Sequence, residues 1–584
     1  MQTLDWIVLA FTLLAIVGYG TWKTRGRKNV QDYIRGGGDA KWWTIGLSVM
    51  ATQASAITFL STPGQAFHDG MGFVQFYFGV PIAMVVICMI FIPLYHKLKV
   101  YTAYEYLERR FDLKTRSLAA ILFLIQRGLA AGITIFAPAI VLSAVLGWNL
   151  TMLNIIIGIL VIIYTVSGGT KAVSVTQKYQ MVVIFTGMII AFFIILNALP
   201  QDITFSKALD IAGASGKMDI LDFSFSLDNR YTFWSGIIGG TFLALSYFGT
   251  DQSQVQRYLS GKSMKEMQLG LIFNGLFKVP MQFFILLIGV MVFMFYQFNA
   301  SPLNFNPEAK KAINNSQYVE EYAALEKKQE DIFINKQASI AQYLEDSNSN
   351  NAQELIDANK ADRANRDAAK ALIAKVSEEQ NLSVESNDKD YVFIHFILNN
   401  LPRGLIGLLL AVILSAAMSS TASELNALAS TTTIDLYRRN LRESKDEKHY
   451  VKAAKWFTFA WGILAILIAC VAYLAENLIE LVNIIGSIFY GNVLGIFLIA
   501  FFFKQVRSNA VFLAALITQA IVIALFFLNR FDYINLPYLW LNFVGCVIVI
   551  FIALLLSFNS ANRKDKLSLA ILSGLLGFVT YTII

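Results

Sequence analysis

The sequence predicts an all-α polytopic membrane protein with about fourteen transmembrane helices. Three observations lead to this fold class. Hydrophobic residues make up 56% of the 584 positions and charged residues 15%, whereas soluble proteins are about 45–50% apolar and about 25% charged. Apolar runs of roughly 18–25 residues recur along the chain, and each is long enough to cross about 30 Å of hydrocarbon. Basic residues gather in alternate loops between these runs, as they do in the cytoplasmic loops of membrane proteins.

The apolar runs define the predicted spans in chain order. They cover residues 5–22, 43–62, 73–95, 118–146, 151–167, 178–198, 231–250, 271–297, 402–432, 454–473, 479–503, 509–528, 538–558 and 566–584. Basic residues (Lys23, Arg25, Arg27 and Lys28) follow the first run, which is typical of an anchor with its N-terminus outside and not of a cleavable signal. The loop bias predicts that both termini are extracytoplasmic, in the plasma membrane (the inner membrane of a Gram-negative cell). The net charge of +7 has the same origin, so the predicted partner is a lipid bilayer and not a nucleic acid.

Residues 298–391 interrupt the membrane pattern, because they are polar and rich in Ala, Asn, Lys and Glu. They are predicted to form exposed helices with charge pairs on the extracytoplasmic side. Three interpretations of this insert remain open: a solubilising cap, a docking surface for a partner, and a site of substrate capture.

Residues 48–67, "SVMATQASAITFLSTPGQAF", place polar side chains and a Pro-Gly pair inside an apolar stretch. A broken helix persists in hydrocarbon only where it lines a cavity or binds a ligand, and transporters use such breaks to hold ions and solutes. The break is expected around Ala51–Ser55. A second break is expected within 243–259, "LALSYFGTDQSQVQRYL", where Ser246, Gly249, Thr250, Asp251 and Gln252 interrupt another span.

The two breaks indicate how the chain is divided. Each opens a segment of five spans, so the sequence predicts a five-plus-five inverted repeat of the leucine-transporter type. The predicted units are an N-terminal span and loop (1–42), the first repeat (43–198), an outer loop (199–230), the second repeat (231–503) with the insert 298–391 inside it, and C-terminal accessory spans (504–584).

Two further polar features lie inside predicted spans. Ser419 and Ser420 lie deep in the ninth span, where two hydroxyls and the carbonyls of an unwound helix could supply oxygen ligands to sodium, a hard cation. The same hydroxyls can instead bond their own helix backbone. Arg127 puts a permanent cation in the fourth span, where mid-membrane arginine costs about 2.5–3.5 kcal/mol. Arg127 is interpreted either as the ion-pair partner of Glu424 or as a bidentate clamp for a substrate carboxylate.

Six stretches together resemble the sodium:solute symporter family and, within it, the bacterial sialic acid transporters. They are "DYIRGGGDAKWW", "GLSVMATQASAITFLSTPGQAF", "KLKVYTAYEYLERRFD", "GGTKAV", "DQSQVQRYL" and "SAAMSSTASELNALASTTTIDLY". The resemblance covers the chain apart from the insert and the last spans. It implies a sodium site formed by the carbonyls of Ala51, Ala54 and Ala416 and the hydroxyls of Ser419 and Ser420. It also places the substrate residues at Gln53, Ser55, Thr58, Phe73, Tyr77 and Arg127, of which Gln53 and Tyr77 differ in type from those transporters.

The resemblance also bears on stoichiometry. Some family members have an aspartate of a second sodium site where this chain has Gln177, and Ala422 replaces a serine of that site, although Ser423 is kept. One sodium per solute is therefore predicted, with the alternative that Glu424, an unfamiliar charge in that region, restores a cation site instead of neutralising Arg127.

The predicted function is sodium-coupled import of a small organic solute by alternating access, with a carboxylated sugar such as sialic acid or another organic anion as the solute. A neutral sugar or polyol is the alternative solute, and it would require Arg127 to be occupied by Glu424. A membrane sensor and a passive channel are the rival classes. An enzyme is not predicted, because the sequence lacks the HExxH, GxSxG and phosphate-loop motifs, and its histidines have no metal-ligand spacing.

Overall fold

The computed structural model describes residues 2–24, 30–225, 229–380, 382, 384–441, 445–471 and 478–558. Its elements are α1 (Thr3–Thr24), α2 (Val30–Arg35), η1 (Gly36–Gly38), α3 (Trp42–Gln53), α4 (Ala56–Asp69), η2 (Gly70–Tyr77), α5 (Gly79–Val86), η3 (Ile87–Phe91), α6 (Ile92–Leu98), α7 (Glu105–Arg110), α8 (Leu113–Leu146), α9 (Leu150–Asn197), α10 (Phe205–Ala214), α11 (Phe233–Gly249), α12 (Gln252–Leu259), α13 (Met264–Phe298), α14 (Pro307–Asn314), α15 (Val319–Glu345), α16 (Ser349–Glu379), α17 (Lys389–Asn400), α18 (Leu405–Thr431), η4 (Thr432–Tyr437), α19 (Arg438–Asn440), α20 (Glu447–Ala469), α21 (Leu478–Phe502), α22 (Ser508–Arg530) and α23 (Tyr538–Phe558).

The predicted all-α membrane fold is confirmed for the described residues. Their only strand-like pairing is an isolated bridge between Ala40 and Gly261. Nine described helical segments are long and apolar enough to cross a membrane, and three shorter apolar helices accompany them. The predicted span 566–584 and the basic residues of 25–28 lie outside the described residues, so the count of fourteen spans stays a prediction.

Both predicted helix breaks are present. Helix α3 ends at Gln53 and α4 begins at Ala56, because Ala54 (ψ 76°) and Ser55 (ψ 175°) leave the helical conformation. The Ser55 amide donates to the Gln53 carbonyl at 3.1 Å instead of continuing the helical ladder to Ala51. The second break falls at residues 250–251, between α11 and α12.

Helix α9 joins the fifth and sixth predicted spans through one non-helical residue, Gly169 (φ 59°, ψ −172°). A straight helix of its 48 residues would be about 72 Å long, more than twice the hydrocarbon thickness. The chain turns back instead: Gly158 lies against the C-terminal half of α20, Gly169 against Tyr33 of α2, and Gly187 against the first turns of α18. A Cβ at position 169 would lie 2.9 Å from the Tyr33 carbonyl oxygen, so this positive-φ position requires glycine.

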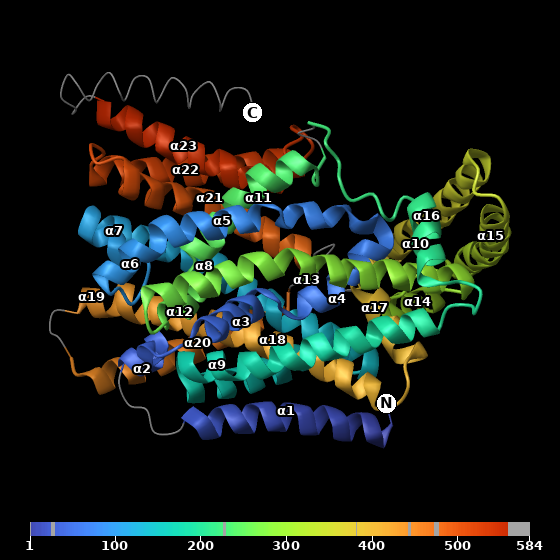
Figure 1. The fold of residues 1–584 in the computed structure, drawn as a ribbon, viewed down its shortest axis with the longest axis horizontal. Helices are drawn as coiled ribbons and strands as arrows, with labels where there is room; N and C mark the ends of the chain where they lie inside the picture. The colour runs from blue at the N-terminus through green and yellow to red at the C-terminus, as the bar shows by residue number, and fades with distance from the viewer. Residues whose placement is uncertain are drawn as a thin grey trace.

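The insert lies at one end of the bundle. Helices α15 and α16 pack together as a hairpin, and α14, α15 and α16 share a small apolar core of their own that includes Ile313, Tyr322 and Ile373. Figure 1 shows this hairpin at the end toward which the N-terminus of α1 also lies. Helices α2, α7, α12 and α19 lie at the opposite end (Figure 1). The arrangement puts the N-terminus and the insert on the same side of the molecule.

Close packing of α4 against α13 and α17 depends on two glycines. A Cβ at Gly64 would lie 1.8 Å from the Lys389 carbonyl oxygen, and one at Gly289 would lie 2.2 Å from the Pro63 carbonyl oxygen. Gly64→Ala is therefore expected to lower the free energy of unfolding by about 1–3 kcal/mol, the usual cost of overpacking. Gly18→Ala on α1 is the matched control, because a Cβ there meets nothing within 4 Å. Equal melting temperatures of the two variants in detergent would contradict this packing.

Candidate functional site

The break between α3 and α4 borders a cavity of about 80 Å³, which α8, α11, α18 and α21 also line. Thr52 and Asn483 contribute polar groups to its wall, and Ile57 and Leu243 contribute apolar ones. Ligand pockets usually measure about 300–1,000 Å³. A sugar-sized solute therefore enters only if the surrounding elements move apart.

Five of the six predicted substrate residues line this cavity: Gln53, Ser55, Thr58, Tyr77 and Arg127. Gln53 Oε1 is buried and has no hydrogen-bond partner among the described residues, so it is free to accept a bond from a solute. Phe73 is not part of the lining. It stacks on Phe76, a lining residue, with ring centroids 5.6 Å apart. Its predicted role in substrate binding stays a prediction.

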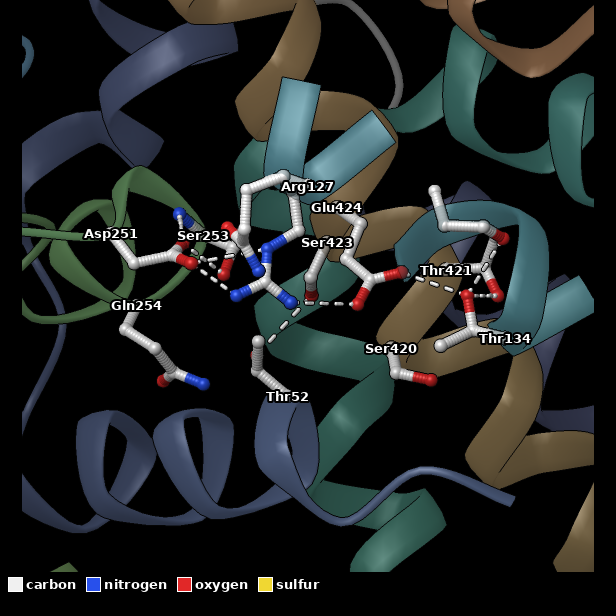
Figure 2. A network of polar contacts seen from close by, with 12 residues as sticks. Thr52, Arg127, Thr134, Asp251, Ser253, Gln254, Ser420, Thr421, Ser423 and Glu424 are labelled. Atoms are coloured by element: carbon white, nitrogen blue, oxygen red, sulfur yellow. Dashed lines mark hydrogen bonds and ion pairs between the residues drawn. The ribbon is translucent and has the colours of Figure 1, made fainter. Parts of the chain in front are cut away.

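Arg127 of α8 lies between two carboxylates that come from distant parts of the chain (Figure 2). Its Nη1 donates to Glu424 Oε1 of α18 at 3.1 Å, which is the ion pair that one of the two interpretations of Arg127 expected. Its Nε donates to Asp251 Oδ2 at 3.1 Å, and Nη2 also contacts that oxygen. Thr134 donates to Glu424 Oε2 at 2.8 Å, and the Tyr490 hydroxyl donates to Asp251 Oδ2 at 2.9 Å.

Every guanidinium nitrogen of Arg127 has a partner, and only Nη1 keeps one unused N–H, which is one fewer than a bidentate contact needs. One guanidinium facing two carboxylates also gives the cluster a formal excess of one negative charge. The clamp interpretation of Arg127 therefore requires a solute carboxylate to displace Asp251 or Glu424. Asp251 was visible in the sequence only as part of a helix break, and nothing in the sequence pointed to Tyr490 of α21.

The five predicted sodium ligands are all buried, and α3 and α4 both pack against α18. The Ser55 amide bonds elsewhere, so the Ala51 carbonyl is released from the helical ladder at the break. Ser419 Oγ is buried and has no hydrogen-bond partner among the described residues. Ser420 Oγ donates to the Ala416 carbonyl at 3.1 Å, which is the backbone bonding that the alternative interpretation expected. Neutral oxygens of this kind suit a hard monovalent cation, and the five-ligand site stays a prediction.

Gln177 of α9 stands where the resemblance implies an aspartate of a second sodium site, and both atoms of its amide are hydrogen-bonded. Its Oε1 accepts from Ser48 Oγ at 2.5 Å, and its Nε2 donates to Ser423 Oγ at 2.9 Å. The amide hydrogens of Gln177 therefore point at Ser423 Oγ, an oxygen that a bound cation would need as a ligand. This geometry disfavours a cation beside Gln177.

A buried cation lies next to the same group. Arg257 of α12 is fully buried, and its Nη1 contacts Ser174 Oγ at 3.4 Å, which in turn accepts from Ser48 Oγ at 3.3 Å. None of the ion pairs found within the described chain involves Arg257, and its Nε has no partner there. Its positive charge further disfavours a second cation nearby.

Two broken helices that meet a polar cavity inside a membrane bundle are the architecture of secondary transporters. The model of the sodium:solute symporter family matches residues 33–328 and 369–518 of this chain. The chain therefore belongs to the sodium:solute symporter family, as its motifs predicted.

Several relatives show what the chain is similar to. It is 32% identical to the human sodium/iodide cotransporter over 50% of this chain, which spans 45% of that protein's length. It is 27% identical to sodium-coupled monocarboxylate transporter 1 of Xenopus laevis, over 86% of this chain and 68% of the relative. It is 25% identical to the sodium/sialic acid symporter of Proteus mirabilis (strain HI4320), over 89% of each chain.

A solved transporter structure has a similar fold. The structure of a Na⁺-coupled sialic acid symporter in a substrate-bound outward-open state has a TM-score of 0.73 and 23% identity, and the match covers 95% of this chain and 98% of that one. The likeness establishes a shared fold and confirms the predicted leucine-transporter-type class.

Proposed function

We propose that this protein is a plasma-membrane symporter that imports a small organic anion together with sodium by alternating access. The observation that carries the proposal is the helix break at residues 54–55, which frees the Ala51 carbonyl. Helices α3 and α4 pack against α18, on which the Ser419 hydroxyl has no hydrogen-bond partner among the described residues. Sodium binding would link the broken helix to α18 and favour the state that accepts the solute. Closure and opening to the other side would then release both.

The membrane potential would contribute to accumulation. One elementary charge moved across 100 mV is worth about 2.3 kcal/mol, and about 1.4 kcal/mol corresponds to a factor of ten. The proposed orientation places the N-terminus and the insert outside. The placement of α2, α7, α12 and α19 at the other end supports it, because these elements and the adjoining loops carry many of the basic residues (Figure 1).

Separate observations favour an anionic solute and a neutral one. An anion is favoured because the relatives named above are sodium-coupled transporters of iodide, monocarboxylates and sialic acid, and the last two of these solutes are organic. A neutral sugar or polyol is the second candidate, because both Asp251 and Glu424 occupy Arg127. A solute anion would gain two parallel hydrogen bonds from Arg127 only by displacing one of these carboxylates.

Thermal stabilisation of the purified protein tests the proposal. Sialic acids, uronates, monocarboxylates and neutral sugars are added separately, in sodium and again in potassium. Stabilisation by a carboxylate in sodium only is the expected result. Stabilisation by neutral sugars alone would move the assignment to the second candidate, and equal stabilisation in potassium would overturn sodium coupling.

One sodium ion is expected to accompany each solute molecule, because Gln177 and Arg257 disfavour a second cation. The ratio of sodium flux to solute flux, measured with isotopes in proteoliposomes, should therefore be one. The sodium dependence of the uptake rate should be hyperbolic and not sigmoidal. A flux ratio of two would show that a second cation site exists despite the amide.

A further inference from the structure

A second cavity of about 460 Å³ lies where the insert meets the end of the bundle. We name it the insert cavity. Its walls come from the end of α4, the loop after α10, the end of α13, and helices α15 and α16. The family model does not match residues 329–368, which supply much of the α15–α16 wall. The insert cavity is thus built partly from a segment that lies outside the family match, and it is several times larger than the cavity at the helix break.

The insert cavity is strongly cationic. Seven of its lining side chains are lysine or arginine, and three are aspartate. Asp362 pairs with both Lys336 and Arg366, at 3.0 Å each. Asp69 likewise faces two cations, Lys389 at 2.8 Å and Arg363 at 3.4 Å. Each of these carboxylates is shared between two cations. Lys370 and Lys360 pair with carboxylates outside the lining, Asp388 at 3.1 Å and Asp357 at 3.2 Å. The donors that remain are those of the shared pairs and of Lys217.

Lys217 is the clearest of these donors. None of the ion pairs found among the described residues involves it. Its Nζ donates to the His68 carbonyl at 2.6 Å and lies 4.8 Å from the centre of the Phe293 ring. An ammonium has three N–H donors, and the Lys217 ammonium donates a single hydrogen bond within the described part of the chain. Burial lowers the pKa of Lys217 to about 8, which leaves the side chain mostly charged at pH 7.

An aromatic wall lies beside these cations. Phe67 packs edge-on against Phe293 and Tyr296, with ring centroids 5.9 Å and 6.0 Å away, and all three residues line the cavity. A cavity with cations on one side and aromatic rings on another suits an amphipathic ligand that has an anionic group and an apolar body. Arginine and lysine bind carboxylates through charge-assisted hydrogen bonds.

We propose that the insert cavity binds a small organic carboxylate with an apolar body and holds it at the end of the transporter where the insert lies. The class of anion rests on the proposed function, whereas the existence of the site rests on the cavity alone. With the insert outside, the cavity would raise the local concentration of solute at the entrance. The cap interpretation and the substrate-capture interpretation of the insert would then describe the same structure.

Binding to the full-length purified protein in potassium tests the proposal, because the sodium-coupled site is not loaded there. Benzoate and N-acetylneuraminate are the carboxylate probes, and inorganic sulfate is the comparison anion, measured by titration calorimetry. We expect sodium-independent binding of at least one carboxylate. The double variant Lys217→Met/Arg363→Gln should weaken it at least tenfold. Lys360→Glu, on a side chain that is 69% exposed, should weaken it severalfold without affecting folding.

The double variant Lys327→Gln/Lys328→Gln is the matched control, because both residues are exposed on α15 and neither lines the cavity. Absence of binding in potassium, or binding that neither the double variant nor Lys360→Glu weakens, would overturn the site. Sulfate binding as tightly as the carboxylates would overturn the ligand class. If the insert cavity binds but sodium adds no second binding event, the proposed symport fails while this inference stands.

Discussion

Arg127→Met is expected to lower the free energy of unfolding by about 3–5 kcal/mol, the cost of removing one partner from a buried ion pair. The reason is that the substitution leaves Asp251 and Glu424 buried together without their shared cation. Methionine keeps much of the side-chain volume, so packing is largely preserved. The midpoint of unfolding in detergent, followed by helical circular dichroism, measures the effect.

Glu424→Gln is the matched control for this prediction. It leaves Arg127 paired with Asp251 alone and removes the excess negative charge, so its effect should be clearly smaller. The triple variant Arg127→Met/Asp251→Asn/Glu424→Gln removes all three charges and should recover most of the lost stability. Equal shifts for Arg127→Met and Glu424→Gln would contradict the cluster of one cation and two carboxylates.

Ser419→Ala is expected to raise the sodium concentration needed for half-maximal uptake at least tenfold. Its hydroxyl is buried and has no hydrogen-bond partner in the part of the chain that the structure describes, so alanine would remove an oxygen ligand without breaking a bond there. A ligand worth about 1.4 kcal/mol corresponds to a factor of ten in affinity. Ser420→Ala should have the same direction. Uptake into proteoliposomes at graded sodium concentrations provides the measurement.

Ser415→Ala tests whether the effect is specific to the predicted site. Ser415 lies one turn earlier on α18, and its hydroxyl is likewise buried without a partner among the described residues. Its loss should leave the sodium dependence nearly unchanged. A sodium requirement that rises equally in Ser415→Ala and Ser419→Ala would show that small polar residues act there only through packing.

The sequence could predict the helix breaks because polar side chains stand out against hydrocarbon-length apolar runs. The same contrast singled out Arg127, and Glu424 of the ninth span was its obvious partner. The sequence did not reveal Asp251 as a partner of Arg127, because a carboxylate at the start of a helix is already explained as a helix cap. Asp251 does cap α12, and it accepts from the Ser253 amide at 2.8 Å. Its contact with Arg127 spans 124 positions in the chain, and only the tertiary fold establishes it.

The insert illustrates a different limit. Its charged helices were predictable from composition, but the insert cavity also needs Lys217, which comes from the predicted outer loop, and Phe293 from the end of α13. Phe73 and Phe76 also show that the sequence does not reveal which of two neighbouring side chains reaches a cavity. Both are aromatic residues on one irregular turn, and the backbone of η2 decides which of them faces the cavity.

The turn at Gly169 has a consequence for how the chain enters the membrane during synthesis. One residue is far too short to cross a headgroup layer, so the turn must stay at one surface while both halves of α9 occupy the lipid. The two halves therefore leave the insertion machinery as a single hairpin and not as independent segments. Tyr33 and Lys171 lie at that surface, with the Lys171 ammonium paired to Asp39. Tyr33 and Asp39 are synthesised before α9, so both are already present when the tip of the hairpin forms. The tip can therefore make these contacts as soon as it has been synthesised.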